Sequence, residues 1–278
     1  MYFQHSAQLW RDFPALVPVV LYAEGITPDV SVADGVARYW ATARTSPTES
    51  ELPQIQAWRR AFASMGMKPT QYRCASEALL RRFRKEGSLP ALHPLVDLCN
   101  AISIACAVPI AAIDLGAISG DLEVRYATGE EKYLTFAGDV EQPSPGEVIF
   151  ADAAGNAHAR RWTNRQSGLS AVRDSTSTVL IVAEALHPTA AEDMPRLLAT
   201  LTSEIAAVWQ TDPVGAILAQ ATPRFQAGRL SCAYGPGFRP ARLAVMIVDH
   251  KLRRSGHSGP RSWKTRSGQH HRPLASWG

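Results

Sequence analysis

An arginine-rich segment with one acid lies between Tyr72 and Arg82, in the order YRCASEALLRR. Glu77 and Arg81 stand four residues apart, which on a helix is the spacing of an internal salt bridge. Arginine is also the residue type that most often contacts the phosphates of nucleic acids, and Arg73, Arg81 and Arg82 are candidates for that role. The sequence leaves both interpretations open, a self-paired helix surface and a surface that binds a nucleic-acid backbone.

A second arginine-rich segment runs from Arg160 to Gly168, in the order RRWTNRQSG. We expect it where a strand ends and a loop begins. Its three arginines suit phosphate contacts, and the indole of Trp162 suits stacking on a base. The alternative is a solvated, twisted strand end with no ligand. The candidate contact residues are Arg160, Arg161, Trp162 and Arg165.

Four polar residues stand inside otherwise apolar segments. Asp97, Asn100 and Ser103 recur at three-residue steps and share one stripe of a predicted helix, and Asp114 follows a predicted strand. Buried polar groups need hydrogen-bond partners or face a pocket, and we expect a pocket here. The chain has no phosphate-binding Gly-rich loop, no Gly-x-Ser-x-Gly elbow and no His-Glu-x-x-His motif. Its His, Asp and Glu residues form no metal-ligand set, so we expect neither a metal nor a cofactor.

Periodicity and turn residues predict an α+β fold in which a mostly antiparallel sheet packs against helices. A buried strand is expected over Phe13–Gly25, and Ser76 is expected to cap a helix that Gly87 ends. The other predicted helices are 32–45, 52–65, 95–107 and 191–209. The other predicted strands are 110–115, 122–126, 148–151, 157–162 and 178–185.

The charge of the chain divides it into two parts. Of 29 Lys and Arg and 25 Asp and Glu, ten basic residues and one acid lie from Gln226 onward, which leaves 19 basic and 24 acidic residues before it. We therefore predict one domain over 1–225 and a basic, disordered tail over 226–278. The tail is either a natural nucleic-acid-binding extension or an out-of-frame extension foreign to the domain. Its dissimilarity to the body favours the second.

Composition also bears on where the protein acts. No run of about 18 apolar residues indicates a membrane span, and no N-terminal pattern indicates a secretory signal. The four cysteines are spaced as in neither a zinc ribbon nor a redox pair, which is typical of buried thiols in a reducing compartment. We expect a soluble, cytoplasmic protein.

An ordered set of segments resembles a known family. The set begins with Trp58 and Phe62 and continues through the segments 72–82, 95–103, 120–127, 160–162 and 166–168. In this order they resemble the B3/B4 domain of the phenylalanyl-tRNA synthetase beta subunit, in the form that occurs as a stand-alone bacterial protein. The resemblance extends over about Phe13 to Trp209.

This resemblance implies an editing module that hydrolyses the ester between a wrong amino acid and the 3′ end of a tRNA, in a pocket between sheet and helices. It makes the chain a candidate trans-editing deacylase with the acceptor end of an aminoacyl-tRNA as its partner. On this hypothesis Asn100 and Ser103 orient the ester and Asp114 positions a water. The residues that hold the acceptor end are then Arg73, Arg81, Arg82, Arg160, Arg161, Trp162 and Arg165.

The chain departs from the synthetase pattern at two editing positions. The resembled domain has a histidine where this chain has Ala111, and a glutamate where it has Arg165. This departure favours a non-catalytic module that binds tRNA, a nucleotide or an amino acid, and the acidic body weighs against tight tRNA binding. A third hypothesis is a metabolic enzyme that has the same fold but an unrelated activity.

Overall fold

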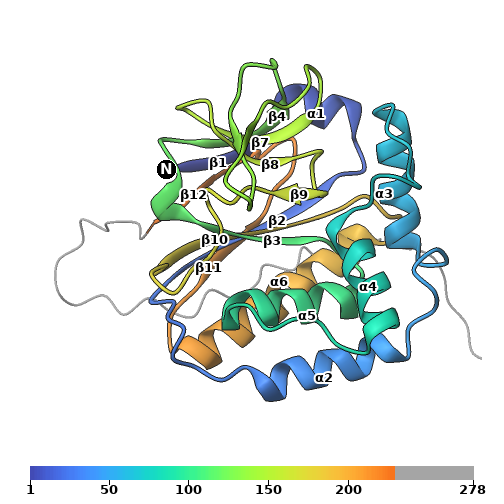
Figure 1. Cartoon of the computed structure of the whole chain (residues 1–278), viewed down its shortest axis with the longest axis vertical. Coiled ribbons are helices and arrows are strands. Elements are labelled where there is room, and N and C mark those ends of the chain that lie inside the picture. The colour runs from blue at the N-terminus through green and yellow to red at the C-terminus, as the bar shows by residue number, and fades with distance from the viewer. Residues whose placement is uncertain (229–278) are drawn as a thin grey trace, which may run out of the picture. The chain divides into compact units, whose positions relative to one another are not determined.

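Two larger sheets and a hairpin organise residues 1–228, the part of the chain that the computed structural model describes (Figure 1). The helices are α1 (Ala7–Asp12), α2 (Ala33–Arg44), α3 (Pro53–Ser64), α4 (Ala75–Glu86), α5 (Pro94–Cys106) and α6 (Ala190–Trp209), with a 3₁₀ turn at Leu115–Ala117. The strands are β1 (Tyr2–His5), β2 (Val17–Glu24), β3 (Ile110–Asp114), β4 (Leu122–Tyr126), β5 (Tyr133–Leu134), β6 (Val140–Glu141), β7 (Val148–Asp152), β8 (Ala157–Arg160), β9 (Arg165–Gln166), β10 (Thr178–Ala185), β11 (Val214–Ile217) and β12 (Arg224–Gln226).

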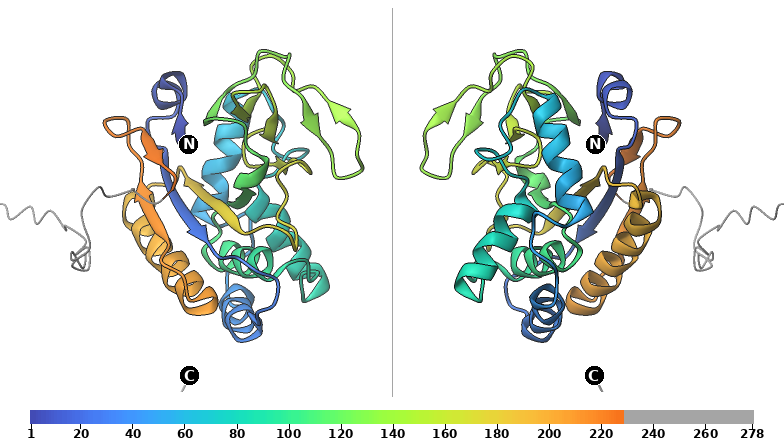
Figure 2. Two further views of the ribbon diagram at one scale, coloured as in Figure 1. Left: turned by 90° about the vertical axis from the view of Figure 1, so that its left-hand side faces the viewer. Right: turned by 90° about the vertical axis from the view of Figure 1, so that its right-hand side faces the viewer.

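The strands of both sheets are mostly antiparallel. The four-stranded sheet has the order β11-β2-β10-β3, and all its neighbouring strands are antiparallel. The six-stranded sheet has the order β12-β1-β4-β7-β8-β9, in which β1 and β4 run parallel and the other neighbours antiparallel. Strands β5 and β6 form a hairpin that projects from the body (Figure 2). The predicted α+β class is confirmed.

The four-stranded sheet is buried on both faces. On one face, Leu21 of β2 packs in an apolar cluster with Leu98 of α5 and Met194 of α6. On the other face, Val20 of β2 packs in a second cluster that includes Phe150 of the six-stranded sheet. This double burial explains why β2 and β10 are continuous apolar runs rather than alternating ones. The space between the two sheets is where the pocket described below lies.

The longer elements agree with the sequence predictions. Helices α2, α3, α5 and α6 and strands β3, β4, β7, β8 and β10 begin and end within two residues of the expected positions. Strand β2 starts later than expected, because Phe13 is the C-cap of α1. Gly87 ends α4 with φ 75°, in the left-handed region that favours glycine. The elements that were not predicted are α1 and the short strands β1, β5, β6, β9, β11 and β12.

The predicted role of Ser76 as a helix cap is wrong. Helix α4 has Cys74 as its N-cap, without a side-chain capping hydrogen bond. Ser76 is fully buried and its hydroxyl donates a 3.2 Å hydrogen bond to the carbonyl of Ala107. Ser76 therefore ties the start of α4 to the turn between α5 and β3.

Both ends of the described chain join the six-stranded sheet. Phe225 of β12 is buried and pairs with Phe3 of β1, and the amide of Ala227 donates to the carbonyl of Met1. Gln226, the first residue of the predicted tail, is the last residue of β12, Ala227 and Gly228 follow it directly, and the rest of the tail lies outside the described residues. Within the described part, none of the helices is both long and apolar enough to cross a membrane.

Two of the predicted buried thiols are confirmed. Cys74 and Cys99 are buried and unbonded to another cysteine, and Cys106 is half-buried. Burial raises the pKa of the Cys74 thiol to about 11 and that of Cys99 to about 12, so both stay protonated at neutral pH. Cys232 lies outside the described residues.

Candidate functional site

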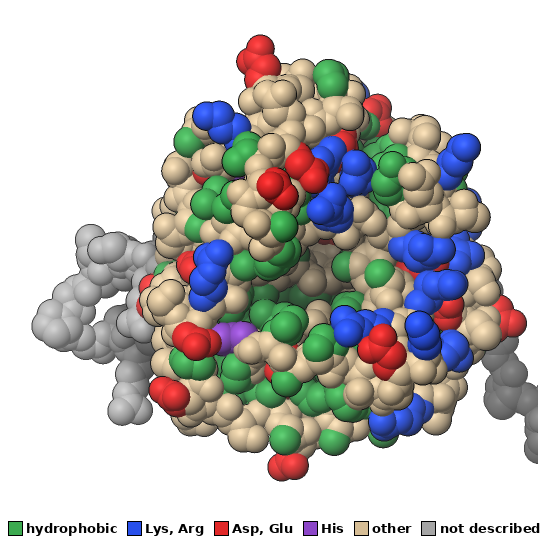
Figure 3. Space-filling view, viewed as in Figure 1, with side chains coloured by type: hydrophobic (Ala, Val, Ile, Leu, Met, Phe, Trp, Pro, Cys, Tyr) green, Lys and Arg blue, Asp and Glu red, His purple; other side chains and the backbone are tan. Residues whose placement is uncertain are grey.

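A small pocket opens between the four-stranded sheet, the start of α4 and the segment that links β8 to β9. Its walls come from Ala75 of α4, from the segment 109–111 at the start of β3, from the segment 162–166, and from Val182 and Glu184 of β10. The cavity has a volume of about 70 Å³, which is space for several water molecules. The face that carries α3, α4 and β9 is visibly hollowed, and Lys and Arg side chains gather beside the hollow (Figure 3).

The pocket contains both positions at which the chain departs from the synthetase pattern. Ala111 lies on β3 opposite Val182, and Arg165 begins β9. The side chain of Arg165 is 43% exposed, lies 3.6 Å from the carboxylate of Glu141 and leans over the ring of Tyr133. The structure therefore brings together two positions that the resemblance marks, although they are far apart in the sequence.

The inner wall is built around Trp162. Its ring is fully buried and packs edge-on against Trp58, with the ring centroids 5.0 Å apart. Arg161 and Trp162 have φ values of 49° and 57°, a left-handed conformation that non-glycine residues rarely adopt. Such strain persists only where the surrounding packing fixes the backbone. Here the turn directs the indole into the core, and its Nε1 donates a 2.8 Å hydrogen bond to Glu184.

Glu184 is a buried carboxylate at the floor of this pocket. Only 2% of the residue is exposed, and it lies on β10 in a run of apolar residues. Besides the indole of Trp162, Nε2 of His5 lies 2.6 Å from the same oxygen, Oε1. His5 belongs to β1 of the six-stranded sheet and is itself buried. Three elements from both sheets thus meet at one carboxylate.

Sequence reasoning missed Glu184. Strand 178–185 was assigned from its apolar pattern, and its one acid was not considered. The signal that was available is the position itself, because an acid inside a continuous apolar strand needs a partner or a function.

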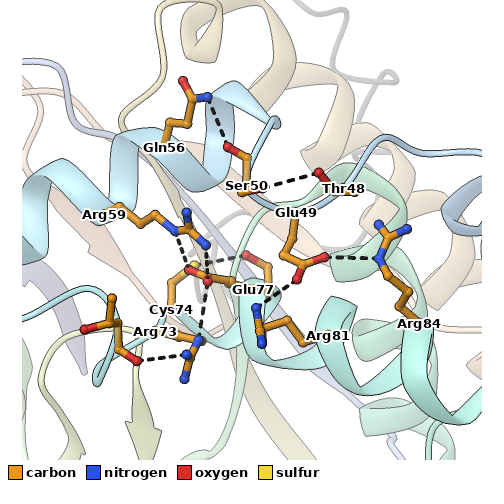
Figure 4. A network of polar contacts seen from close by, with 12 residues as sticks. Thr48, Glu49, Ser50, Gln56, Arg59, Arg73, Cys74, Glu77, Arg81 and Arg84 are labelled. Carbon is orange, nitrogen blue, oxygen red and sulfur yellow. Dashed lines mark hydrogen bonds and ion pairs between the residues drawn. The ribbon is translucent and has the colours of Figure 1, made fainter.

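The arginines of α3 and α4 form a dense polar network (Figure 4). Arg59 binds both carboxylate oxygens of Glu77, at 2.7 and 3.2 Å, and Arg73 lies 3.5 Å from the same carboxylate. Of the two interpretations of this segment, the internal salt bridge between Glu77 and Arg81 is therefore not formed. Glu77 is fully buried and turned toward α3, whereas Arg81 points outward and binds Glu49 at 3.1 Å.

Glu49 neutralises part of this basic surface. It also accepts a 3.1 Å hydrogen bond from Arg84. Burial opposes the charge on Glu49, but backbone and Arg84 hydrogen bonds and the charges of Arg84 and Arg81 outweigh it, so its pKa is lowered. Between Pro53 and Glu86 the chain nevertheless carries eight Lys or Arg and two acids. The side chains of Arg81 and Arg82 are each 50% exposed, so they are accessible to a ligand.

Arg160 and Trp162 are not placed as the sequence predicted. Arg160 is buried, its Nε and Nη2 bind the carboxylate of Glu147 at 2.8 and 3.0 Å, and its Nη1 binds Glu141 at 2.5 Å. It joins β8 to the β5–β6 hairpin, and all three of its guanidinium nitrogens already bind carboxylates. The ring of Trp162 is internal and cannot stack on an exposed base. Arg161, half-buried over the ring of Tyr72 at 4.8 Å, and Arg165 remain near the surface.

The three predicted catalytic residues do not share one pocket. Asn100 and Asp97 line a separate cavity between α2 and α5. Ser103 is fully buried, and its hydroxyl donates a 2.6 Å hydrogen bond to the carbonyl of Val108, which fixes the turn into β3. Asp114 accepts hydrogen bonds from the amide of Gly116 and the hydroxyl of Thr176, at a third location.

A pocket does lie beside Asp97, but it is the cavity between α2 and α5 and does not include Ser103 or Asp114. Burial raises the pKa of the Asp97 carboxyl, although the amide of Leu92 donates to it. The cavity around it is otherwise mostly apolar. As for metals, residues 1–228 include no group of three His, Cys, Asp or Glu side chains that would hold an ion.

Comparison with known proteins gives a consistent result. The sequence model of the B3/4 domain family matches residues 57–207, more than half of the chain. The phenylalanine–tRNA ligase beta subunit of Shewanella oneidensis is 29% identical over 116 residues, which cover 41% of this chain and 14% of that protein. The corresponding subunit of Tropheryma whipplei is 27% identical over 147 residues, which cover 48% of this chain and 15% of that protein.

A solved structure is also similar. An N-terminal fragment of the phenylalanyl-tRNA synthetase beta subunit from Pyrococcus horikoshii aligns with a TM-score of 0.43 and 10% identity, over 77% of this chain and 53% of that one. The present chain spans about one seventh of the length of the two curated relatives.

Proposed function

Because the chain belongs to the B3/4 domain family, we propose that it is a trans-editing deacylase, which hydrolyses the ester of tRNAs mischarged by another enzyme. Its curated relatives are named as beta subunits of phenylalanine–tRNA ligases. Since it spans about one seventh of their length, their activity and their substrates come to it only within this proposal. A cytoplasmic location belongs to the same proposal, because aminoacyl-tRNAs are made and used there.

The pocket that contains Ala111 and Arg165 supports this proposal most directly. An aminoacyl ester is already activated, so a catalyst needs only to place a water and to stabilise the charge that develops on the carbonyl oxygen. The pocket has room for water, a cationic side chain at Arg165 and a carboxylate at Glu184. These are groups that such a hydrolysis requires, even without the histidine and glutamate of the synthetase pattern.

The size of the pocket suggests which amino acid would be removed. A volume of about 70 Å³, lined in part by the bulky rings of Trp162 and Phe150, suits a small side chain such as that of alanine or serine better than an aromatic ring. We therefore expect tRNAs that carry a small amino acid to be the preferred substrates.

The acceptor end would approach over α4 and β9. Arg73, Arg81 and Arg82 of the first segment and Arg161 and Arg165 of the second remain candidates for its phosphates, since their side chains are at least partly exposed. Several of them are already paired with Glu49, Glu77 or Glu141, which reduces the charge available to RNA. We expect weak, strongly salt-dependent binding, as suits an enzyme that must release each tRNA.

The direct test is hydrolysis of a panel of aminoacyl-tRNAs, correctly charged and mischarged, by the full chain. Release of the amino acid above the spontaneous rate from one or a few species would support the proposal and identify the substrate. No release from any species across the panel would contradict it.

A binding module is the second candidate. The specific observation in its favour is that Ala111 and Arg165 stand where the synthetase pattern has its histidine and glutamate. A module of this kind would bind tRNA, a nucleotide or a free amino acid without turnover. A charged tRNA would therefore keep its amino acid through a long incubation with the protein. Salt-dependent tRNA affinity without ester hydrolysis would select this candidate.

A further inference from the structure

We propose that Glu184 is the general base of the pocket and that His5 and Trp162 position it. This inference rests on the proposed function, because it names the residue that activates water for the ester hydrolysis. It is independent of the synthetase pattern, whose two editing side chains the chain lacks at Ala111 and Arg165.

The hydrogen bonds of Glu184 leave one oxygen for a ligand. Nε1 of Trp162 and Nε2 of His5 both approach Oε1, at 2.8 and 2.6 Å. Among the described residues, no protein donor binds Oε2. Glu184 is buried and lines the pocket. Its Oε1 is therefore held by two donors, while its Oε2 is left for a ligand.

A purely structural role explains this arrangement less well. A buried carboxylate that only ties two sheets together is expected to have both oxygens satisfied, because an unpaired buried acceptor is destabilising. Apart from Glu184, no acid is among the residues that line this pocket. Val182, two residues before Glu184 on the same face of β10, pairs with Ala111, so Glu184 shares the pocket with the place of the missing histidine.

The step balances without a cofactor. Oε2 of Glu184 takes a proton from a water molecule as the water oxygen bonds to the ester carbonyl carbon. Arg165 lines the pocket and is 43% exposed, and in this step its guanidinium stabilises the oxygen that becomes negative rather than an acceptor-end phosphate. The bond between that carbon and the ribose oxygen then breaks, and the protonated Glu184 returns the proton to the ribose oxygen. The products are the free amino acid and the tRNA with its hydroxyl restored.

The test compares the native chain with Glu184→Gln on the aminoacyl-tRNA that the panel identifies. Glutamine keeps an oxygen for the donors but cannot accept the proton, so we expect kcat to fall about 10²- to 10⁴-fold with KM little changed. Glu192→Gln is the matched control, since Glu192 is exposed at the start of α6 and should leave both constants unchanged. Thermal unfolding checks that each variant folds.

A second variant separates base chemistry from structure. Glu184→Ala leaves space for a small carboxylate. Added formate should therefore raise kcat of Glu184→Ala at least tenfold and should leave kcat of Glu184→Gln unchanged. If neither variant folds, Glu184→Asp keeps the charge but withdraws it from the pocket, and kcat should fall at least tenfold. Native-like kcat in whichever variant folds, or a loss in Glu184→Ala that formate does not restore, would overturn the role of Glu184. Absence of hydrolysis by the native chain would instead overturn the proposed function.

Discussion

The two arginine-rich segments look alike in the sequence but differ in the folded protein. In the segment 72–82, Arg81 and Arg82 lie on α4 and are half exposed, whereas Arg73 precedes the helix. In the segment 160–168 a strand ends in a left-handed turn, and Arg160 and Trp162 are internal while Arg165 is near the surface. Arginine content alone therefore does not identify an RNA-binding surface, because the backbone decides which guanidinium groups remain free.

The largest expected effect is that of Trp162→Ala. The fully buried ring packs against Trp58 and Phe13 and its Nε1 binds Glu184. Removal should lower the free energy of unfolding by about 3–5 kcal/mol, measured by denaturant titration. Arg82→Ala, on the exposed side of α4, should change stability by less than about 0.5 kcal/mol. Equal losses of unfolding free energy in Trp162→Ala and Arg82→Ala would contradict the distinction between an internal segment 160–168 and an exposed helix surface in 72–82.

The next prediction compares two arginines that each form an ion pair with a glutamate, Arg160 with Glu147 and Arg81 with Glu49. Arg160→Met leaves Glu147, whose side chain is only 8% exposed, without its ion-pair partner and should cost about 3 kcal/mol of stability. Arg81→Met should cost less than about 1 kcal/mol, because Arg81 is half exposed and Arg84 still binds Glu49. Urea titration of both variants at neutral pH measures the difference. A smaller loss for Arg160→Met than for Arg81→Met would be the contrary result.

The pH dependence sharpens the same comparison. Burial opposes the charge of Glu147, but Arg160 and the other positive groups outweigh it and lower the pKa of Glu147. The stability that this carboxylate contributes is present above its ordinary pKa of about 4.3 and is lost as pH falls through the lower folded value. The destabilisation by Arg160→Met should therefore shrink by at least about 1 kcal/mol between pH 7 and pH 3. Thermal unfolding at a series of pH values measures it, and a constant difference would contradict the assignment.

The smallest expected effect is on RNA. Replacing Arg81 and Arg82 together by glutamine should weaken tRNA binding about 3- to 10-fold and should reduce the slope of affinity against salt. Glu192→Gln, remote from both segments, is the control. Fluorescence anisotropy with labelled tRNA at several salt concentrations measures both quantities. An unchanged slope would mean that the tRNA does not lie over α4.

Elements with strong periodicity were predictable, and single side chains were not. Helix α6 follows directly from the spacing of apolar residues such as Leu197 and Leu201, and strand β10 follows from its short continuous apolar run. The two-residue strands β5, β6 and β9 have no period to detect, so their positions depend on tertiary contacts. Glu77 pairs with Arg59 of another helix rather than with Arg81, and the spacing along one helix cannot reveal such a partner.

The candidate site shows the same limit. The resemblance located Ala111 and Arg165 in one pocket, because it compares whole ordered segments. Residue type, together with the expected place of the family's pocket, selected Asn100, Ser103 and Asp114, which the fold distributes over three places. Glu184 becomes a candidate only when β1 and the turn at Trp162 are seen to meet at its carboxylate.

Filling the pocket tests the central claim most directly. Ala111→Leu adds apolar volume to a cavity of about 70 Å³, whereas Ala91→Leu adds it to the separate cavity between α2 and α5. The rate of deacylation under single-turnover conditions, with tRNA affinity measured in parallel, is the readout. We predict that Ala111→Leu deacylates at least about tenfold more slowly than the native chain and keeps its tRNA affinity. Ala91→Leu should retain both the native rate and the native affinity. Undiminished hydrolysis by Ala111→Leu would show that the reaction takes place elsewhere.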